Sequence, residues 1–178
     1  MQNWPVDPIS SNKICKLLEK ELQFVSNFEL PAMSNKLILV VEDNPDHLEL
    51  TVLTLEEVGV NAEIAVAHDG AEALDYLFGQ GRHATRDIQR QPDFVLLDMK
   101  LPKLSGLDVL RSVRRNPITA LVPVIMLTSS GEQSDILACY QSGANSFVRK
   151  PVDFADFTEK LDRLQAYWLD VNECPSAT

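Results

Sequence analysis

The stretch Gln91-Pro-Asp-Phe-Val-Leu-Leu-Asp98-Met-Lys-Leu-Pro-Lys-Leu-Ser-Gly106 decides the fold of this chain. Its apolar run, residues 94–97, is short and lies between a proline and a loop with Pro102 and Gly106. Such a run is typical of a strand buried on both faces of a parallel sheet. Asp98 follows the run directly, and ligands of open α/β sheets collect at the carboxyl ends of strands. On this stretch alone, Asp98 could equally open the turn before a helix, because Asp is common in turns.

Short apolar runs and amphipathic segments alternate along the chain on both sides of this stretch. The predicted strands cover residues 37–41, 62–67, 94–97, 122–127 and 146–149, and an amphipathic helix follows each of them. Crossovers between parallel strands are right-handed, and each face of a buried sheet needs covering helices. Five strand–helix repeats therefore predict an α/β, flavodoxin-like (βα)5 fold, a doubly wound parallel sheet in strand order 2-1-3-4-5.

The chain divides into three parts by sequence. Residues 1–33 are expected to form an N-terminal extension with an amphipathic helix, which the run Ser10-Ser-Asn12 could cap. The apolar face of that helix could pack on the main domain, or dock on a partner or a second copy. Residues 34–171 are expected to form the main domain and residues 172–178 a C-terminal tail.

Composition argues against several classes of function. The 178 residues carry a formal net charge of −10, which disfavours nucleic-acid binding because phosphate contacts need clustered Lys and Arg. Three cysteines without CxxC spacing indicate neither a disulfide framework nor a zinc site, and they fit a reducing cytoplasm. No apolar run approaches the roughly 20 residues that span a bilayer, and no secretory signal pattern is present. We therefore expect a cytoplasmic protein that contacts neither nucleic acid nor membrane.

Polar side chains follow four of the predicted strands. They are Glu42 and Asp43 after the first strand, Asp98 after the third, Thr128 after the fourth and Lys150 after the fifth. In the 2-1-3-4-5 order, the first and third strands flank the topological switch point, so their acids converge in one crevice. Each residue alone has an ordinary explanation as a helix-start acid, a helix cap or a solvated surface charge. The coincidence of all four sets at successive strand ends is improbable.

Three carboxylates in one crevice repel one another unless a cation lies among them. Oxygen ligands without His or Cys favour Mg²⁺. The predicted metal site therefore consists of Glu42, Asp43, Asp98 and the backbone carbonyl of Lys100.

A divalent ion, a hydroxyl and an ammonium around one carboxylate are the groups that phosphoryl transfer to that carboxylate requires. Asp98 is the predicted nucleophile, which would form an aspartyl phosphate. Thr128 would donate a hydrogen bond to one phosphoryl oxygen, and Lys150 would neutralise charge on the others.

Six motifs stand in order along the chain: Val41-Glu-Asp-Asn44, Asp98-Met-Lys-Leu-Pro102, Gly106-Leu-Asp-Val-Leu110, Thr128-Ser129, Gly143-Ala-Asn145 and Lys150-Pro151. Together they resemble the receiver domain of two-component response regulators over about residues 34–170. The resemblance implies that Asp98 accepts a phosphoryl group from a sensor histidine kinase, with Mg²⁺ held by the predicted ligands. It also implies a cis peptide bond before Pro151, which proline makes less costly. A receiver is a signalling module, not an enzyme, although it assists its own phosphorylation and dephosphorylation.

Phosphorylation of such a module is expected to repack one of its faces. Movement of Thr128 toward the phosphoryl group would open a space for an aromatic side chain of the fifth strand, and Phe147 holds that place. Phe147 could also simply fill the core. The hypothesis is a two-state change of the face made by the receiver's fourth helix, fifth strand and fifth helix.

The resemblance extends to the single-domain regulators that pair with cyanobacterial and bacterial phytochromes. It rests on a long polar loop over residues 79–91 and on the aromatic end Tyr167-Trp-Leu169, after which only a short tail follows. It implies a stand-alone regulator, a phytochrome as its kinase and a homodimer formed through the last-helix side. Four aromatic residues are candidates for a dimer or partner face: Phe154, Phe157, Tyr167 and Trp168. Phe154 and Phe157 could equally belong to the core. The arginines of the long loop could contact phosphate or a kinase, but they are expected to be solvated.

Two other functions were weighed from the residues. A phosphatase with an aspartyl phosphate intermediate would need a second acid two residues after the nucleophile, where Lys100 stands instead. A scaffold that is not phosphorylated would be favoured by loss of Asp98, Thr128 or Lys150, and all three are present. Dinucleotide binding is disfavoured because no Gly-x-Gly-x-x-Gly follows the first strand.

Overall fold

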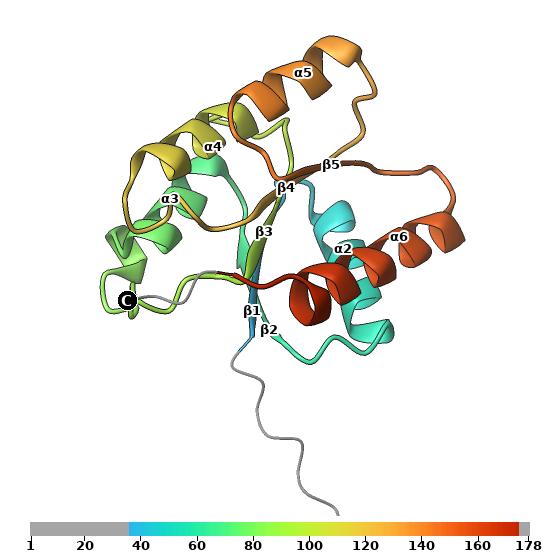
Figure 1. Ribbon diagram of the computed structural model, residues 1–178, viewed down its shortest axis with the longest axis horizontal. Coiled ribbons are helices and arrows are strands. Elements are labelled where there is room, and N and C mark those ends of the chain that lie inside the picture. The colour runs from blue at the N-terminus through green and yellow to red at the C-terminus, as the bar shows by residue number, and fades with distance from the viewer. Residues whose placement is uncertain (1–35, 175–178) are drawn as a thin grey trace, which may run out of the picture. The chain divides into compact units, whose positions relative to one another are not determined.

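The computed structural model describes residues 36–174. Its sheet has five strands in the order β2-β1-β3-β4-β5, and every neighbouring pair is parallel (Figure 1). The strands are β1 (Leu37–Val41), β2 (Glu63–Ala67), β3 (Phe94–Leu97), β4 (Val124–Thr128) and β5 (Ser146–Arg149). The predicted flavodoxin-like fold is therefore confirmed. The predicted helix of the N-terminal extension lies outside the described residues.

Helices cover both faces of the sheet, as a buried parallel sheet requires. On one face lie α2 (Pro45–Glu57) and α6 (Phe154–Ala166), and on the other α3 (Gly70–Phe78), α4 (Gly106–Arg115) and α5 (Gln133–Gln141) (Figure 1). Two short helices, η1 (Gly81–His83) and η2 (Tyr167–Val171), follow α3 and α6. Side chains cap four of these helices: Asn44 for α2, Asp69 for α3, Ser105 for α4 and Asp153 for α6.

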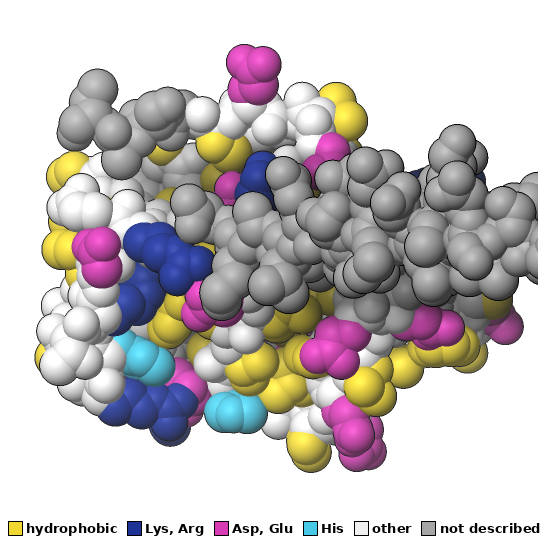
Figure 2. Space-filling model, turned by 90° about the horizontal axis from the view of Figure 1, so that it is seen from below, with side chains coloured by type: hydrophobic (Ala, Val, Ile, Leu, Met, Phe, Trp, Pro, Cys, Tyr) yellow, Lys and Arg dark blue, Asp and Glu magenta, His cyan; other side chains and the backbone are white. Residues whose placement is uncertain are grey.

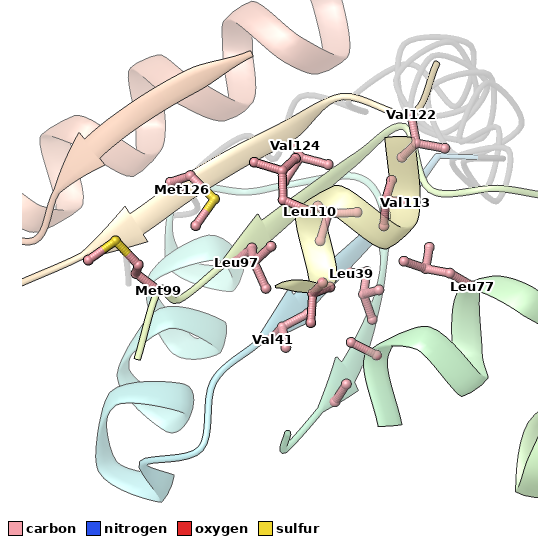
Figure 3. Close-up of a cluster of buried hydrophobic side chains, with 14 of the residues drawn as sticks. Leu39, Val41, Leu77, Leu97, Met99, Leu110, Val113, Val122, Val124 and Met126 are labelled. Carbon is pink, nitrogen blue, oxygen red and sulfur yellow. The ribbon is translucent and has the colours of Figure 1, made fainter. Parts of the chain in front are cut away.

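Alternate residues of the central strands enter two separate cores. In β1, Leu39 and Val41 face the core under α3, α4 and α5, whereas Ile38 and Val40 face the core under α2 and α6. Figure 3 shows the first of these cores, where β1, β3 and β4 side chains meet those of α4. This period of two explains why the strands read as unbroken apolar runs in the sequence.

The boundaries differ from prediction at a few elements. Strand β4 begins at Val124 and not at Val122, because Pro123 has no N–H to donate to a neighbouring strand. The Pro123 carbonyl still accepts a hydrogen bond from the Val95 N–H at 2.9 Å. On α2, the apolar side chain of Leu53 is 53% exposed. Thr51 takes an inward position on α2, since its hydroxyl is satisfied by the His47 carbonyl at 2.8 Å.

The last helix changes its type near its end. Helix α6 ends at Ala166, and the five residues of η2 continue as a π-helix. Lys36, at the start of the described chain, donates a hydrogen bond to the Leu169 carbonyl at 2.5 Å and so joins η2 to the start of β1. None of the helices between residues 36 and 174 has the length and apolar character needed to cross a membrane.

Candidate functional site

Three predicted site residues are fixed in space by the sheet itself. The backbone N–H of Glu42 donates to the Ala67 carbonyl at 3.1 Å, and that of Asp98 to the Val41 carbonyl at 3.0 Å. The N–H of Lys150 donates to the Thr128 carbonyl at 2.9 Å. These bonds extend the strand pairing by one residue, so the three side chains start from the same edge of the sheet.

The side chains of these residues meet in a buried ion cluster. Lys150 Nζ lies 2.6 Å from Asp98 Oδ2 and also contacts Glu42 Oε2. The exposed fractions of the side chains are 9% for Lys150, 12% for Asp98 and 5% for Glu42. Burial raises the pKa of Glu42, the Lys150 ammonium opposes that rise, and the Asp98 carboxylate adds to it. The strand ends therefore hold one cation between two buried carboxylates.

Asp43 does not join this cluster. Its side chain is exposed, and within residues 36–174 no three His, Cys, Asp or Glu side chains are arranged to hold a metal ion. The Lys150 ammonium lies between Glu42 and Asp98 and pairs with both carboxylates. A third carboxylate is then more stable in water than beside them.

The loop after β3 places a peptide group beside Asp98. The N–H of Lys100 donates to Asp98 Oδ1 at 3.1 Å. The N–H of Gly106 donates to the Met99 carbonyl at 3.0 Å, and a Cβ at Gly106 would lie only 2.2 Å from the Asp98 carbonyl oxygen. Position 106 therefore requires glycine, which lets α4 start directly against the end of β3.

Thr128 is the last residue of β4, and Phe147 lies on β5. Thr128 is 1% exposed, and its Oγ1 accepts a hydrogen bond from the Ser130 N–H at 3.3 Å. Phe147 pairs with Met126 in the sheet register and packs, half-buried, on the core under α3, α4 and α5. Both residues thus occupy the strands at which the repacking was predicted.

The predicted cis bond before Pro151 is wrong for this structure, because no peptide bond within residues 36–174 is cis. The trans form is preferred by about 0.5–1 kcal/mol for a bond before proline. From that trans geometry Lys150 still reaches Glu42 and Asp98.

A hollow of about 290 Å³ opens beside Lys150. It lies between α2 and the segment that joins β5 to α6, and His47, Leu50, Phe154 and Phe157 are among its lining residues. His47 Nδ1 is 3.6 Å from Glu42 Oε1, so the hollow reaches the edge of the ion cluster. The site is therefore accessible from the α2 and α6 side.

The four candidate aromatic residues divide into two pairs. Phe157 is buried, and Trp168 packs half-buried on the core under α2 and α6. Phe154 and Tyr167 are 51% and 50% exposed. Only the second pair is free to contribute large side chains to a surface on the last-helix side.

Arg114, in the last turn of α4, has a structural role that the local sequence pattern does not indicate. Its guanidinium donates four hydrogen bonds, to the carbonyls of Gly143 (2.8 Å), Ala120 (3.1 Å) and Val122 (2.8 Å) and to Asn145 Oδ1 (2.6 Å). Burial lowers the pKa of this guanidinium. Arg114 thereby joins the end of α4 to the turn that leads into β5, and only the distant Gly143-Ala-Asn145 motif hinted at a partner.

The arginines of the 79–91 loop were expected to be solvated, and Arg86 is not. Its guanidinium lies 4.2 Å from the ring centre of Tyr76, and it donates to the Tyr76 and Arg90 carbonyls. Gln91 donates to the Leu77 carbonyl at 3.0 Å from the other end of the loop. Figure 2 shows basic and histidine side chains gathered on the side of the molecule where α3 and η1 lie in Figure 1. The loop is therefore packed against α3 by specific contacts.

Comparison with known proteins assigns the family. Residues 38–162 match the model of the response regulator receiver domain. The response regulator Rcp1 of Synechocystis is 30% identical over 142 residues, which cover 80% of this chain and 95% of Rcp1. The Mn(2+)-bound form of Rcp1 superposes with a TM-score of 0.72 at 29% identity, over 79% of this chain and 99% of Rcp1.

Two further solved structures are similar over nearly their whole length. The phosphorylated cyanobacterial phytochrome response regulator RcpA has a TM-score of 0.74 at 30% identity, covering 80% of this chain and 100% of RcpA. The bacteriophytochrome response regulator AtBRR has a TM-score of 0.62 at 45% identity, covering 78% of this chain and 98% of AtBRR. The chain is therefore related to phytochrome response regulators, and it belongs to the response regulator receiver domain family.

Proposed function

We propose that this response regulator accepts a phosphoryl group on Asp98 from a sensor histidine kinase. The observation that carries the proposal is the Lys150 ammonium, 2.6 Å from Asp98 Oδ2 in a buried site. A carboxylate that attacks a phosphoryl group needs positive charge beside the equatorial oxygens, and Lys150 supplies it. An Asp98 oxygen would bond to phosphorus while the bond from phosphorus to a kinase histidine nitrogen breaks, and the imidazole would keep that electron pair.

The proposed cofactor is Mg²⁺, held by Glu42, Asp43, Asp98 and the Lys100 carbonyl. The convergence of the Glu42 and Asp98 carboxylates supports this fit, since both contact the same Lys150 ammonium and so lie close together at the strand ends. The donor set consists only of oxygen, which suits a hard divalent ion. When bound, the ion would neutralise charge on the phosphoryl oxygens. Asp43, exposed at the rim, would have to turn inward to take part.

The proposed output is a repacking of the α5, β5 and α6 face. Lys150 already contacts Asp98 and would pair with the phosphoryl oxygens formed there, while Thr128 would shift toward those oxygens. Phe147, which is half-buried, would then move into the space beside Thr128. Phe lacks the hydroxyl that could anchor an outward position, so the change rests on packing alone.

The proposed kinase is a phytochrome, because RcpA and AtBRR carry that description and both align over most of the chain. The hollow beside Lys150, with its exposed Leu50 and Phe154 side chains, would receive the kinase surface that presents the phosphohistidine. We further propose a homodimer through the last-helix side, with Phe154 and Tyr167 as anchors, and a cytoplasmic location.

Incubation with Mg²⁺ and acetyl phosphate, followed by intact-mass measurement, tests the proposed function. The parent should gain the mass of one phosphoryl group, and removal of Mg²⁺ with a chelator should abolish the gain. Asp98→Asn keeps the size of the side chain and should gain nothing. Asp108→Asn is a matched control, because Asp108 is an exposed acid on α4 away from the ion cluster. Equal labelling of the parent and Asp98→Asn would refute the proposal.

A further inference from the structure

The loop that follows Asp98 contains a strained turn. Lys103 has φ 65° and is the only residue other than glycine with a positive φ within residues 36–174. Across it, the Leu104 N–H donates to the Pro102 carbonyl at 2.8 Å. A hydrogen bond of this span around a positive φ makes a γ-turn, which is rare for a residue with a Cβ. Such a conformation persists only where the surrounding structure holds it.

The side chain of Lys103 is held by the start of α3. Its Nζ lies 2.5 Å from Asp69 Oδ2, while Asp69 Oδ1 accepts the Glu72 N–H at 2.8 Å and so caps the helix. One carboxylate therefore fixes both the first turn of α3 and the γ-turn. The Asp69 side chain is only 16% exposed, which sets this ion pair apart from the pairs whose two partners are both solvated.

The backbone of α3 also touches the turn. A Cβ added to Gly70 would lie 2.4 Å from the Leu104 carbonyl oxygen, so helix and loop are in direct contact. At the other end of the loop, Gly106 packs against the Asp98 carbonyl in the same way. The segment between Asp98 and Gly106, which includes Lys100, is therefore clamped between α3 and the end of β3.

We propose that Lys103 and Asp69 form a positioning pair for Mg²⁺ binding. Their ion pair holds the γ-turn of the loop whose Lys100 N–H donates to Asp98 Oδ1 at 3.1 Å, and through that loop it would orient the Lys100 carbonyl. The inference rests on the proposed function, because that carbonyl is one of the proposed ligands. Lys103 and Asp69 themselves lie outside the proposed ligand set and act only through the loop.

Two substitutions separate the ion pair from the other roles of these residues. Asp69→Asn removes the charge and keeps a good helix cap, whereas Lys103→Asn removes the ammonium and keeps a residue that tolerates a positive φ. Each should weaken Mg²⁺ binding about three- to tenfold, the range expected when a strained loop gains competing conformations. The double variant Asp69→Asn/Lys103→Asn should bind Mg²⁺ as tightly as either single variant, because both substitutions remove the same contact. Lys103→Arg, which can restore the pair, should restore the affinity.

Calorimetric titration with MgCl₂ measures the Mg²⁺ affinity. The rate of labelling by acetyl phosphate at increasing Mg²⁺ concentration measures how Mg²⁺ binding supports phosphorylation. The half-saturating Mg²⁺ concentration should rise in both single variants, while the labelling rate at saturating Mg²⁺ and the thermal unfolding midpoint without Mg²⁺ stay near the parental values. Arg163→Gln, which removes an exposed pair with Glu159 on α6, is the matched control and should bind like the parent.

Three results would overturn the inference. Parental affinity in Asp69→Asn and Lys103→Asn would show that the pair does not position the ligand. An equal loss in Arg163→Gln would show a general charge effect. A parent that neither binds Mg²⁺ nor takes a phosphoryl group would overturn the proposed function, and the inference with it.

Discussion

Replacement of Lys150 by methionine would show how far the buried carboxylates depend on the ammonium between them. Lys150→Met keeps most of the side-chain length and leaves Glu42 and Asp98 as two buried like charges. Removal of one partner from a buried ion pair costs about 3–5 kcal/mol, because the remaining charge is no longer compensated. The free energy of unfolding of a natural domain is about 5–15 kcal/mol, so the variant should lose a large share of its stability at neutral pH.

Urea unfolding with and without millimolar Mg²⁺ is the assay. Mg²⁺ should restore more stability to Lys150→Met than to the parent, because an ion that binds the folded state stabilises it and now meets no competing ammonium. Lys160→Met is the control: Lys160 is exposed, donates only to the Arg149 carbonyl at 3.2 Å and should change the unfolding free energy by less than about 0.5 kcal/mol. A loss in Lys150→Met no larger than in this control, or the same response to Mg²⁺ as the parent, would refute the reasoning.

Three further predictions follow from the site and its supports. Because burial raises the pKa of Glu42 above its ordinary value of 4.5, the folded state holds that proton more tightly, so stability from this group is full below pH 4.5 and falls as the pH rises. Glu42→Gln should remove this pH dependence. Urea unfolding of both proteins from pH 4.5 upward checks it: the unfolding free energy of the parent minus that of the variant should fall as the pH rises. A difference that stays constant with pH would contradict the prediction. Arg114→Met should lower the unfolding free energy by about 2–4 kcal/mol through its four hydrogen bonds, whereas exposed Arg115→Met should cost less than about 0.5 kcal/mol; similar losses would exclude a special role for Arg114. Gly106→Ala should cost about 1–3 kcal/mol in the same assay, since its Cβ would overlap the Asp98 carbonyl, and should weaken Mg²⁺ binding in calorimetry; unchanged values would show that the loop moves freely.

The fold could be predicted because its strands are buried on both faces. The runs Leu37–Val41 and Phe94–Leu97 have no exposed positions to interrupt them, so their length and bounds are visible in the sequence. Strand β4 was less well placed, because Pro123 looks apolar in the sequence and yet cannot donate to the ladder.

The candidate site could be predicted in part for the same reason. Parallel strands end at one edge of the sheet, so Glu42, Asp98 and Lys150 had to start near one another. The sequence could not show that the Lys150 ammonium lies between the Glu42 and Asp98 carboxylates. The ammonium lies between Glu42 and Asp98, and the Asp43 side chain is exposed.

Long-range hydrogen bonds could not be predicted from local pattern. Arg114 looked like a solvated charge favoured by the helix dipole, and its partners Ala120, Gly143 and Asn145 lie on two other segments. The γ-turn at Lys103 was equally hidden, because Lys has no preference for a positive φ and takes it only with the support of Asp69.

The most direct test of the account is to identify the atom that carries the phosphoryl group. After labelling with Mg²⁺ and acetyl phosphate, borohydride reduction converts an aspartyl phosphate to homoserine, which peptide mass spectrometry locates in the chain. The account predicts homoserine at position 98, and none when Mg²⁺ is withheld. Homoserine at another aspartate, or a stable phosphate on a hydroxyl or imidazole side chain with Asp98 unchanged, would contradict it.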